Sequence, residues 1–259
     1  MTFGLIFDCD GVLADTERYG HLPAFNQTFA ELGLPVQWTE EEYGRRLAIG
    51  GGKERLASLL TSELVAQAGL PESVDQQRDL VARWHKRKTE IYTAMVAAGT
   101  LPARPGVRRL VGEAHDAGWR LAVASTSAEE SVRAVLEHVV GDLSLYFEVL
   151  AGDVVPYKKP APDIYLLARE RIALPAGDLM VVEDSRNGLV AAHAAGLQCL
   201  VTVNGYTRDE DFGEAAMVVS SLGDPGGEHT TVLANSASVK VGGWITVETL
   251  TDLLRRERP

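Results

Sequence analysis

Two aspartates stand two residues apart at the end of the first hydrophobic run of the chain. The run FGLIFD (3–8) is typical of a buried strand, and Asp10 follows Asp8 after a single cysteine. Neighbouring carboxylates repel each other and lose hydration when they are buried. In a strand, the two-residue spacing directs both side chains toward one side. This stretch therefore predicts a positively charged partner beside Asp8 and Asp10.

Further polar groups follow hydrophobic runs in the same way. Ser125 ends the run RLAVAS, and Lys159 precedes the sequence PAPD after another run. Glu183 and Asp184 end the run LMVVED. Because the carboxyl ends of parallel strands meet at one edge of a sheet, we expect these groups to gather on one rim.

Short hydrophobic runs alternate with helical patterns along most of the chain. Buried-strand patterns cover residues 3–8, 120–125, 147–152, 179–184, 198–203 and 216–221. Helical patterns cover residues 107–118, 128–139, 162–172 and 185–196. This alternation favours an α/β fold with a doubly wound, Rossmann-like parallel sheet. We expect a surface loop over 223–238 and a final helix over 245–258.

Residues 17–100 interrupt this alternation with helical patterns alone, over 17–32, 39–48, 52–68 and 73–98. An insertion after the first strand of a parallel sheet begins at the carboxyl edge, where ligands bind. We therefore predict two domains, a catalytic core of residues 1–16 and 101–259 and a helical cap of residues 17–100. The linkers would lie near 14–18 and near 99–106, where the second contains prolines and glycines.

The composition disfavours several classes of protein. The 259 residues carry a net charge of −11, which argues against nucleic acid or an anionic membrane surface as a partner. The two cysteines, Cys9 and Cys199, offer neither a disulfide framework nor a zinc motif. No hydrophobic run approaches the ~18 residues of a membrane helix, and the first ten residues do not resemble a signal peptide. We expect a cytoplasmic protein.

Four sequence motifs occur in the order found in a known family. They are DCDGVL (8–13), VASTS (123–127), KKPAPDIY (158–165) and VVEDSRNG (181–188). Together they resemble the haloacid dehalogenase (HAD) superfamily of phosphohydrolases over essentially the whole chain. The resemblance implies that Asp8 is a nucleophile that forms an aspartyl phosphate. It implies that Asp10 is the general acid and base.

The resemblance also implies a Mg²⁺ ion as cofactor. The family binds this ion through the Asp8 carboxylate, the Asp10 backbone carbonyl and Asp184, with water completing the octahedron. Glu183 would orient metal-bound water as an outer-shell group. The ion would shield the anionic nucleophile from the anionic phosphate.

A phosphate site completes what the resemblance implies for the core. Ser125, the Thr126 backbone and Lys159 would hold the phosphoryl oxygens, over which charge spreads in the transition state. Lys158 is interpreted as a surface or rim charge, because Lys159 directly precedes the Pro-Ala-Pro sequence.

Other polar residues also have a structural interpretation. Asp15 and Thr16 can close a turn and cap the helix that follows, and Ser185 and Asn187 can begin the helix after Asp184. His21, in the first cap helix, has either a packing or a substrate role. Surface or packing positions are expected for Cys9, His115, His138 and His193.

The most informative stretch of the predicted cap is EEYGRRLAIGGGKERL (41–56). Gly51 and Gly52 precede Lys53 and Arg55 at an expected helix start, where backbone N–H groups and the two cations could hold an anion. The alternative is a flexible loop followed by a solvated basic helix end. An anion site in the cap opposite a phosphate site in the core would suit a substrate with two phosphates, or with one phosphate and another acid.

The chain is similar to the CbbY-type branch of the family, which includes xylulose-1,5-bisphosphate phosphatases that remove a misfire product of Rubisco. The stretches that carry this resemblance are 15–33, 41–43, 51–56 and 158–165. It implies that Glu17 bonds sugar hydroxyls. Tyr43, Arg46 and Lys53 would hold the distal end of the substrate.

The predicted function is Mg²⁺-dependent hydrolysis of a sugar bisphosphate, from xylulose 1,5-bisphosphate to xylulose 5-phosphate, by a monomer. Three alternatives stay open. The first is a phosphosugar mutase similar to β-phosphoglucomutase, the second is a phosphatase of broad specificity, and the third is a sugar-phosphate sensor without catalysis.

Overall fold

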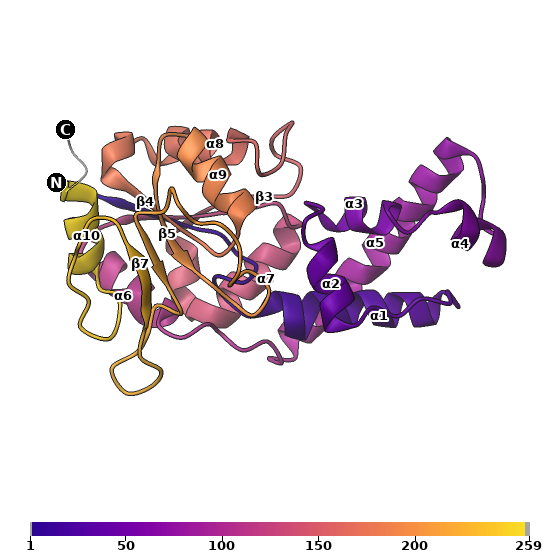
Figure 1. Ribbon diagram of the computed structural model, residues 1–259, viewed down its shortest axis with the longest axis horizontal. Coiled ribbons are helices and arrows are strands. Elements are labelled where there is room, and N and C mark those ends of the chain that lie inside the picture. Colours follow the sequence, from indigo (N-terminus) through magenta and orange to yellow (C-terminus); the bar gives the residue numbers. More distant parts are fainter. Residues whose placement is uncertain (1, 257–259) are drawn as a thin grey trace. The chain divides into compact units, whose positions relative to one another are not determined.

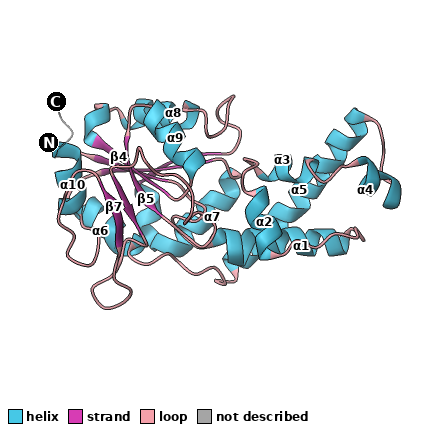
Figure 2. Cartoon of the chain, viewed as in Figure 1, coloured by secondary structure: helices cyan, strands magenta, loops and turns pink. Residues whose placement is uncertain are grey.

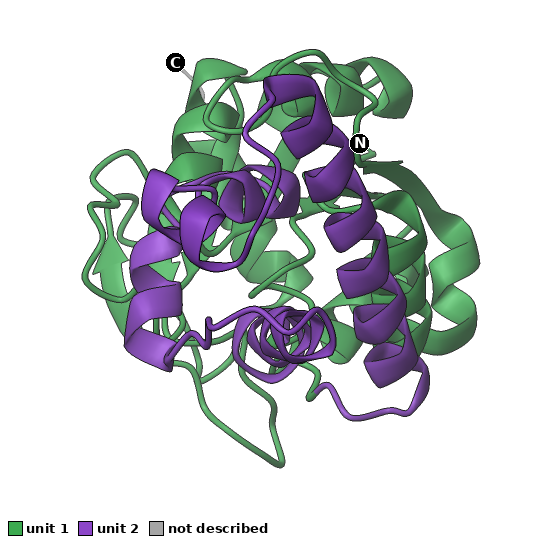
Figure 3. Ribbon diagram, turned by 90° about the vertical axis from the view of Figure 1, so that its right-hand side faces the viewer, with its two compact units in different colours: residues 1–15, 102–259 green, residues 16–101 purple. Residues whose placement is uncertain are grey.

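The computed structural model describes residues 2–256 of the chain. Its internal contacts form two compact units, which Figure 3 colours separately. The core unit comprises residues 1–15 and 102–259, and the cap unit comprises residues 16–101. These boundaries differ by one residue from those that the sequence patterns suggest. Within residues 2–256, no helix combines the length and hydrophobicity that crossing a membrane requires.

The core unit is built on a seven-stranded sheet with the order β3-β2-β1-β4-β5-β6-β7, in which β7 alone is antiparallel to its neighbour. Figures 1 and 2 show strands of this sheet with helices of the core unit around them. Its strands are β1 (Gly4–Phe7), β2 (Arg120–Ser125), β3 (Phe147–Ala151), β4 (Leu179–Glu183), β5 (Gln198–Thr202), β6 (Met217–Val219) and β7 (Val232–Asn235). The helices of this unit are α6 (Val107–Asp116), α7 (Glu129–Val140), α8 (Asp163–Ile172), α9 (Arg186–Ala194) and α10 (Val247–Arg256). The predicted doubly wound α/β fold is confirmed.

Strand β1 lies at the centre of the sheet and sets the position of the site. It pairs in parallel with β2 on one side and β4 on the other, so the chain winds outward in both directions from β1. Every residue of β1 and β4 is buried, because helices cover both faces of the sheet. The strand order reverses at β1, and the crevice at the carboxyl end of such a strand is where ligands bind in open α/β sheets.

Alternate residues of the strands pack into two hydrophobic layers. Ile6, Ala122 and Val181 belong to the layer beneath α8 and α9, together with Ile164 and Leu189 from those helices. Helix α6 contacts α7 and α10, and these helices belong to the other layer. The large buried area fixes the register of the strands, since a slip of one residue would exchange the two faces.

The predicted surface loop over residues 223–238 is wrong in part. Within it, β7 pairs with β6 through the register Val218↔Ala234. Its residues are exposed or half-buried, so the segment lacks the hydrophobic run that would identify a buried strand. It forms a strand because the open edge of β6 offers unpaired backbone groups.

Within the described residues of the cap unit, all regular secondary structure is helical. It begins with a π-helical turn (Glu17–His21) that leads into α1 (Leu22–Glu31). The other helices are α2 (Glu40–Arg46), α3 (Gly52–Ala57), α4 (Ser62–Gln67) and α5 (Val74–Ala97). Helix α5 contacts both α1 and α3 and forms the spine of the unit.

Two local predictions in the cap unit are wrong. The single helix expected over 52–68 is divided into α3 and α4, because Thr61 caps a new helix by accepting a hydrogen bond from the backbone N–H of Leu64 at 3.2 Å. Thr16 occupies the N-cap position before Glu17, but its side chain makes no capping hydrogen bond. In the core unit, the expected N-cap of α9 does form, because Ser185 Oγ accepts a hydrogen bond from the backbone nitrogen of Gly188 at 3.2 Å.

Candidate active site

The candidate active site begins where β1 ends. Strand β1 stops at Phe7, so Asp8 and Asp10 lie in the turn that follows and not within the strand, and the argument from strand alternation does not apply to them. The backbone of Asp8 still donates a hydrogen bond to Val182 of β4 at 2.9 Å. The side chain of Asp8 is buried, so its carboxyl group lies in the interior of the protein.

Lys159 supplies a positive charge beside Asp8, where the interpretation of the sequence placed Mg²⁺. Its Nζ donates to Asp8 Oδ1 and to Glu183 Oε1, both at 2.6 Å, and to the backbone oxygen of Ala124 at 2.9 Å. An ammonium group has three N–H donors, so all three are satisfied in this buried position. Lys158 instead pairs with Asp153 at 3.4 Å, outside this network.

Glu183 is held from several sides. The Tyr165 hydroxyl donates to the same Oε1 that Lys159 contacts, and the backbone nitrogen of Asp184 donates to Oε2 at 3.1 Å. Gly188 leaves room for this carboxylate, because a Cβ at that position would lie only 1.9 Å from Glu183 Oε1. The motif VVEDSRNG therefore contains its glycine for a packing reason.

Asp184 faces the turn that carries Asp8 and Asp10. Its Oδ2 accepts a hydrogen bond from Asn204 Nδ2 at 2.6 Å. Oxygen atoms of Asp8, Glu183 and Asp184 lie within 4.8 Å of one another, and all three residues are buried. Carboxylate oxygens grouped in this way fit a hard divalent cation such as Mg²⁺.

Asp10 and the serine-rich stretch after β2 lie on the same rim. The Ser127 hydroxyl donates to Asp10 Oδ2. Ser125 is buried at the end of β2, and its Oγ accepts from the backbone nitrogen of Ser127 at 3.1 Å. Thr126, between them, is half-buried.

Without a metal ion, the carboxylates of this cluster outnumber its one ammonium group, that of Lys159. Burial raises the pKa of Asp8 to about 7, and Glu183 and Asp10 add to the rise while Lys159 opposes it. Burial alone would lower the pKa of Lys159, but the neighbouring Asp8 and Glu183 outweigh it and raise this pKa. One ammonium group does not compensate the carboxylates around it, so the site is suited to a second positive charge.

The cap unit contains a second buried polar cluster. The Tyr43 hydroxyl donates to Glu17 Oε2, and Arg55 Nη1 donates to the Tyr43 oxygen at 2.6 Å. Arg55 also lies 3.6 Å from the Glu17 carboxylate, and both side chains are about nine-tenths buried. Arg46 is not in this set; its guanidinium lies over the Trp38 ring at 4.7 Å and bonds Ser58 at 3.3 Å.

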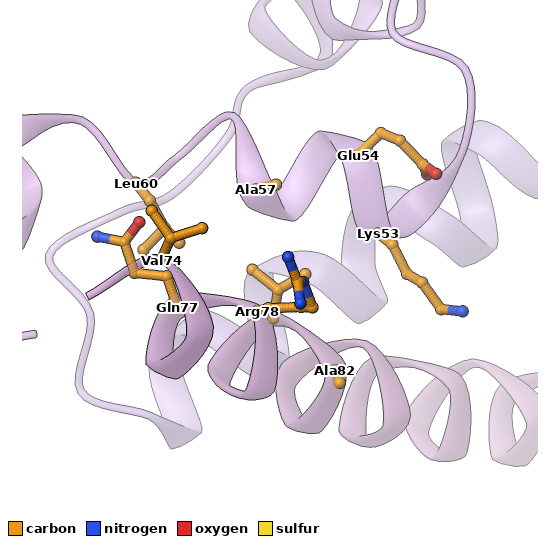
Figure 4. Close-up of a pocket in the computed structure, with 9 residues that line it drawn as sticks. Lys53, Glu54, Ala57, Leu60, Val74, Gln77, Arg78 and Ala82 are labelled. Carbon is orange, nitrogen blue, oxygen red and sulfur yellow. The ribbon is translucent and has the colours of Figure 1, made fainter. Parts of the chain in front are cut away.

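The glycine-rich stretch before Lys53 leads into a helix, as expected, and the anion site predicted there stays a prediction. Helix α3 is only six residues long, and Gly51 precedes it with a φ of 97°. Gly52 packs against His85, whose Nε2 would lie 3.1 Å from an added Cβ. Lys53 is exposed and lines a cavity of about 520 Å³ between α3 and α5, together with Arg78 and hydrophobic side chains (Figure 4).

His21 is buried and has a specific partner. Lys88 Nζ lies 2.5 Å from His21 Nδ1, and the imidazole stacks on Tyr92 at a centroid distance of 4.1 Å. His115, His138 and His193 lie on helices of the core unit at partly or fully exposed positions. Cys9 is a buried thiol, as expected.

Sequence patterns missed four residues of these clusters as site residues: Tyr165, Ser127, Asn204 and Lys88. Arg55 was predicted as an anion ligand, and its contact with Tyr43 was not foreseen. Tyr165 and Ser127 stand inside quoted motifs, and Asn204 directly follows the hydrophobic run QCLVTV. A polar residue after a strand is the signal that could have identified Asn204. For Lys88, the signal was a lysine on the hydrophobic face of α5.

Comparison with known proteins agrees with this geometry. A family model described as haloacid dehalogenase-like hydrolase matches residues 4–196. A CBBY-like protein from Arabidopsis thaliana is 45% identical over 85% of this chain and 69% of its own length. Protein CbbY from Cereibacter sphaeroides is 41% identical over 88% of this chain and 95% of its own length.

Solved structures show the same relationship. CbbY from Rhodobacter sphaeroides, in complex with phosphate, is 40% identical with a TM-score of 0.76, over 88% of this chain and 97% of its own. A mutant of that protein was solved in complex with xylulose-(1,5)bisphosphate, with the same TM-score and 39% identity over the same shares. The chain therefore belongs to the haloacid dehalogenase-like hydrolase family and is a CbbY-like phosphatase.

Proposed function

We propose that this protein hydrolyses a phosphate monoester of a sugar bisphosphate through an aspartyl phosphate on Asp8, with Mg²⁺ as cofactor. The proposed substrate is xylulose 1,5-bisphosphate, and the products are xylulose 5-phosphate and inorganic phosphate. The observation that carries the proposal is the buried Asp8 carboxylate, bonded to Lys159 and grouped with Glu183 and Asp184.

The first chemical step would be attack by an Asp8 carboxylate oxygen on the phosphorus of the substrate. A bond forms from Asp8 to phosphorus as the bond from phosphorus to the sugar oxygen breaks. Asp10 would give a proton to the departing sugar oxygen and would later take one from the water that hydrolyses the aspartyl phosphate. Ser127 supports this role, because its hydrogen bond limits the rotation of the Asp10 carboxylate.

Lys159 would bind the phosphoryl group by exchanging partners. Its three donors are already used by Asp8, Glu183 and Ala124, so a phosphoryl oxygen must replace one of them. Ser125 and the Thr126 backbone would supply further donors to the phosphoryl oxygens. A donor set that is in place before the reaction stabilises the charge of the transition state.

The Asp8 and Asp184 carboxylates and the Asp10 backbone carbonyl would hold the Mg²⁺ ion. When bound, the ion would neutralise carboxylate charge and reduce the repulsion between Asp8 and the phosphate. Glu183 would stay outside the ligand set, since Lys159 and Tyr165 already occupy its Oε1.

We propose that residues 16–101 form a cap that recognises the rest of the substrate. Glu17 would accept hydrogen bonds from sugar hydroxyls. The second phosphate would be bound by Tyr43, Arg46, Lys53 and the backbone of Gly51 and Gly52, and we add Arg55 because it directly contacts Tyr43. The solved complex of a CbbY protein with xylulose-(1,5)bisphosphate supports this choice of substrate class.

The test is phosphate release in the presence of Mg²⁺ across a panel of substrates. The panel contains xylulose 1,5-bisphosphate, ribulose 1,5-bisphosphate, fructose 1,6-bisphosphate, glucose 1-phosphate and phosphoglycolate. We expect kcat/KM for xylulose 1,5-bisphosphate to exceed the others by about 100-fold, or about 2.7 kcal/mol. Equal activity on all five would contradict the proposed substrate. A bisphosphate that rearranges without releasing phosphate would favour the mutase alternative.

A further inference from the structure

Asn204 lies outside the motifs that identify the family, yet it contacts the candidate metal site. It comes two residues after β5 and is 8% exposed. Its Nδ2 donates to Asp184 Oδ2 at 2.6 Å, and Asp184 is 6% exposed. A hydrogen bond from a neutral amide to a buried carboxylate is stronger than one between neutral groups.

The orientation of the Asn204 amide is determined by its neighbours. Its Oδ1 accepts from the backbone nitrogen of Tyr206 at 2.8 Å, and a backbone N–H can only donate. The amide nitrogen must therefore face Asp184. The Asn204 backbone is also held, since its nitrogen donates to Thr207 Oγ1 at 3.2 Å.

Gly11 provides the space for this pair. It has a φ of 79°, and a Cβ there would lie 2.1 Å from Asp184 Oδ2 and 2.8 Å from Asn204 Nδ2. The turn that follows Asp10 therefore approaches the hydrogen bond between Asn204 and Asp184 without any intervening side chain. Three separate segments of the core unit converge on one carboxylate oxygen.

We infer that Asn204 is a positioning residue that orients Asp184 for the cation and favours Mg²⁺ over Ca²⁺. The inference rests on the metal site of the proposed function. The hydrogen bond from Asn204 to Oδ2 restricts rotation of the Asp184 carboxylate. It also competes with an ion for Oδ2, so it disfavours binding of the ion through both carboxylate oxygens. Mg²⁺ requires octahedral geometry at short distances, whereas Ca²⁺ accepts bidentate carboxylates. The amide also adds no charge to an already acidic cluster.

The experiment measures metal binding directly, without substrate. Mn²⁺ is titrated into metal-free full-length protein and followed by electron paramagnetic resonance, and Mg²⁺ and Ca²⁺ are then added as competitors. The variants are Asn204→Ala, which removes the amide, and Asn204→Leu, which removes the donor but keeps the volume. Circular dichroism identifies folded variants, and either folded variant is sufficient for the test.

Asn235→Ala is the matched control. Like Asn204, Asn235 uses both side-chain atoms in hydrogen bonds, but both go to the backbone of Val239: Nδ2 donates to Val239 O at 2.7 Å, and Oδ1 accepts from Val239 N at 3.1 Å. It lies on β7 at the edge of the sheet. The control thus loses the hydrogen bonds of a partly buried asparagine side chain, away from the acidic cluster. Its metal affinities should stay within about twofold of the wild type, since an outer-shell effect requires contact with a ligand.

We expect Mg²⁺ affinity to fall about tenfold or more in the Asn204 variants, the effect usual for outer-shell partners of metal ligands. Ca²⁺ affinity should change less than about threefold, so the preference for Mg²⁺ should shrink. Unchanged Mg²⁺ affinity would overturn the inference, and so would equal losses for both ions. A wild-type protein that binds no Mn²⁺ would instead remove the proposed metal site itself.

Discussion

The acidic cluster of the core unit and the Glu17–Tyr43–Arg55 cluster of the cap unit are assembled in different ways. In the core, Asp8 and Glu183 lie at the ends of neighbouring parallel strands, which necessarily meet at one edge of the sheet. In the cap, Glu17 lies in a π-helical turn, Tyr43 on α2 and Arg55 on α3. Sheet topology positions the first cluster, whereas the packing of short helices positions the second.

Under the proposed function, this difference would separate chemistry from substrate recognition. The core cluster is charged, buried and tightly hydrogen-bonded, so changes there should affect the reaction with every substrate. The cap cluster pairs one carboxylate with a phenol and a guanidinium, so changes there should depend on the substrate. Variants of the two clusters test this distinction, and we expect the largest effects in the core cluster.

Asp8→Asn should reduce phosphate release by about 10,000-fold or more, which corresponds to about 5.5 kcal/mol. The amide keeps the shape of the side chain but cannot act as the nucleophile. Steady-state phosphate release measures the effect. Asp153→Asn is the control, because Asp153 is exposed and pairs with Lys158 and not with Lys159. Comparable turnover in Asp8→Asn and the control would show that the core cluster does not perform the chemistry.

Lys159→Met should lower the free energy of unfolding of the metal-free protein by about 3–5 kcal/mol, because Asp8 and Glu183 would lose their buried cation. It should also lower kcat by about 100-fold, through loss of a phosphoryl donor. Urea unfolding and steady-state kinetics measure the two effects. The adjacent Lys158→Met should change stability by less than about 1 kcal/mol. Similar results for both lysines would argue against the network described around Lys159.

Arg55→Ala should lower kcat/KM for xylulose 1,5-bisphosphate about 30-fold, or about 2 kcal/mol, and should have little effect on a monophosphate of the same sugar. The reason is that Arg55 holds Tyr43 and lies beside Glu17. Arg46→Ala provides the comparison, since Arg46 lies over Trp38 and contacts Ser58. We expect a smaller loss from this variant. A larger loss from Arg46→Ala would show that Arg46, and not Arg55, contributes more to substrate binding.

The last prediction concerns the pH dependence of stability. The pKa of Asp8 is raised from 3.8 to about 7 in the folded protein, first by burial. Between these values the folded state holds a proton that the unfolded chain releases, so the stability of the metal-free protein should fall as pH rises. Urea unfolding in a chelator at about pH 4.5 and about pH 7.5 tests this. Asp8→Asn should show a weaker fall, and an identical pH dependence in both proteins would contradict the assignment.

Much of the core could be predicted from the sequence because its signals are local. Each buried strand is a short hydrophobic run, and each polar group of the acidic cluster stands near the end of such a run. Lys159 was distinguished from Lys158 by its place before Pro-Ala-Pro, and it does contact Asp8. Strand β7 could not be recognised, since its exposed residues carry no such pattern.

The cap was harder to predict because helical spacing does not specify which side chains meet. Arg46 and Arg55 both lie near Tyr43 in the sequence, but only Arg55 bonds it. The glycines before Lys53 predict an anion site, which stays a prediction, and the close approach of His85 to Gly52 is a second reason for a glycine there. The cytoplasmic location and the monomeric state stay predictions.

Under the proposed function, Asp8 carries the phosphoryl group during turnover. The most direct measurement is to quench the wild-type protein with acid during turnover of xylulose 1,5-bisphosphate with Mg²⁺, and to reduce it with borohydride. Borohydride converts an aspartyl phosphate to homoserine, which mass spectrometry can locate in a peptide. We predict homoserine at position 8, absent without substrate and absent in Asp8→Asn. Continued phosphate release with no modification at position 8, or with modification at another residue, would contradict the account.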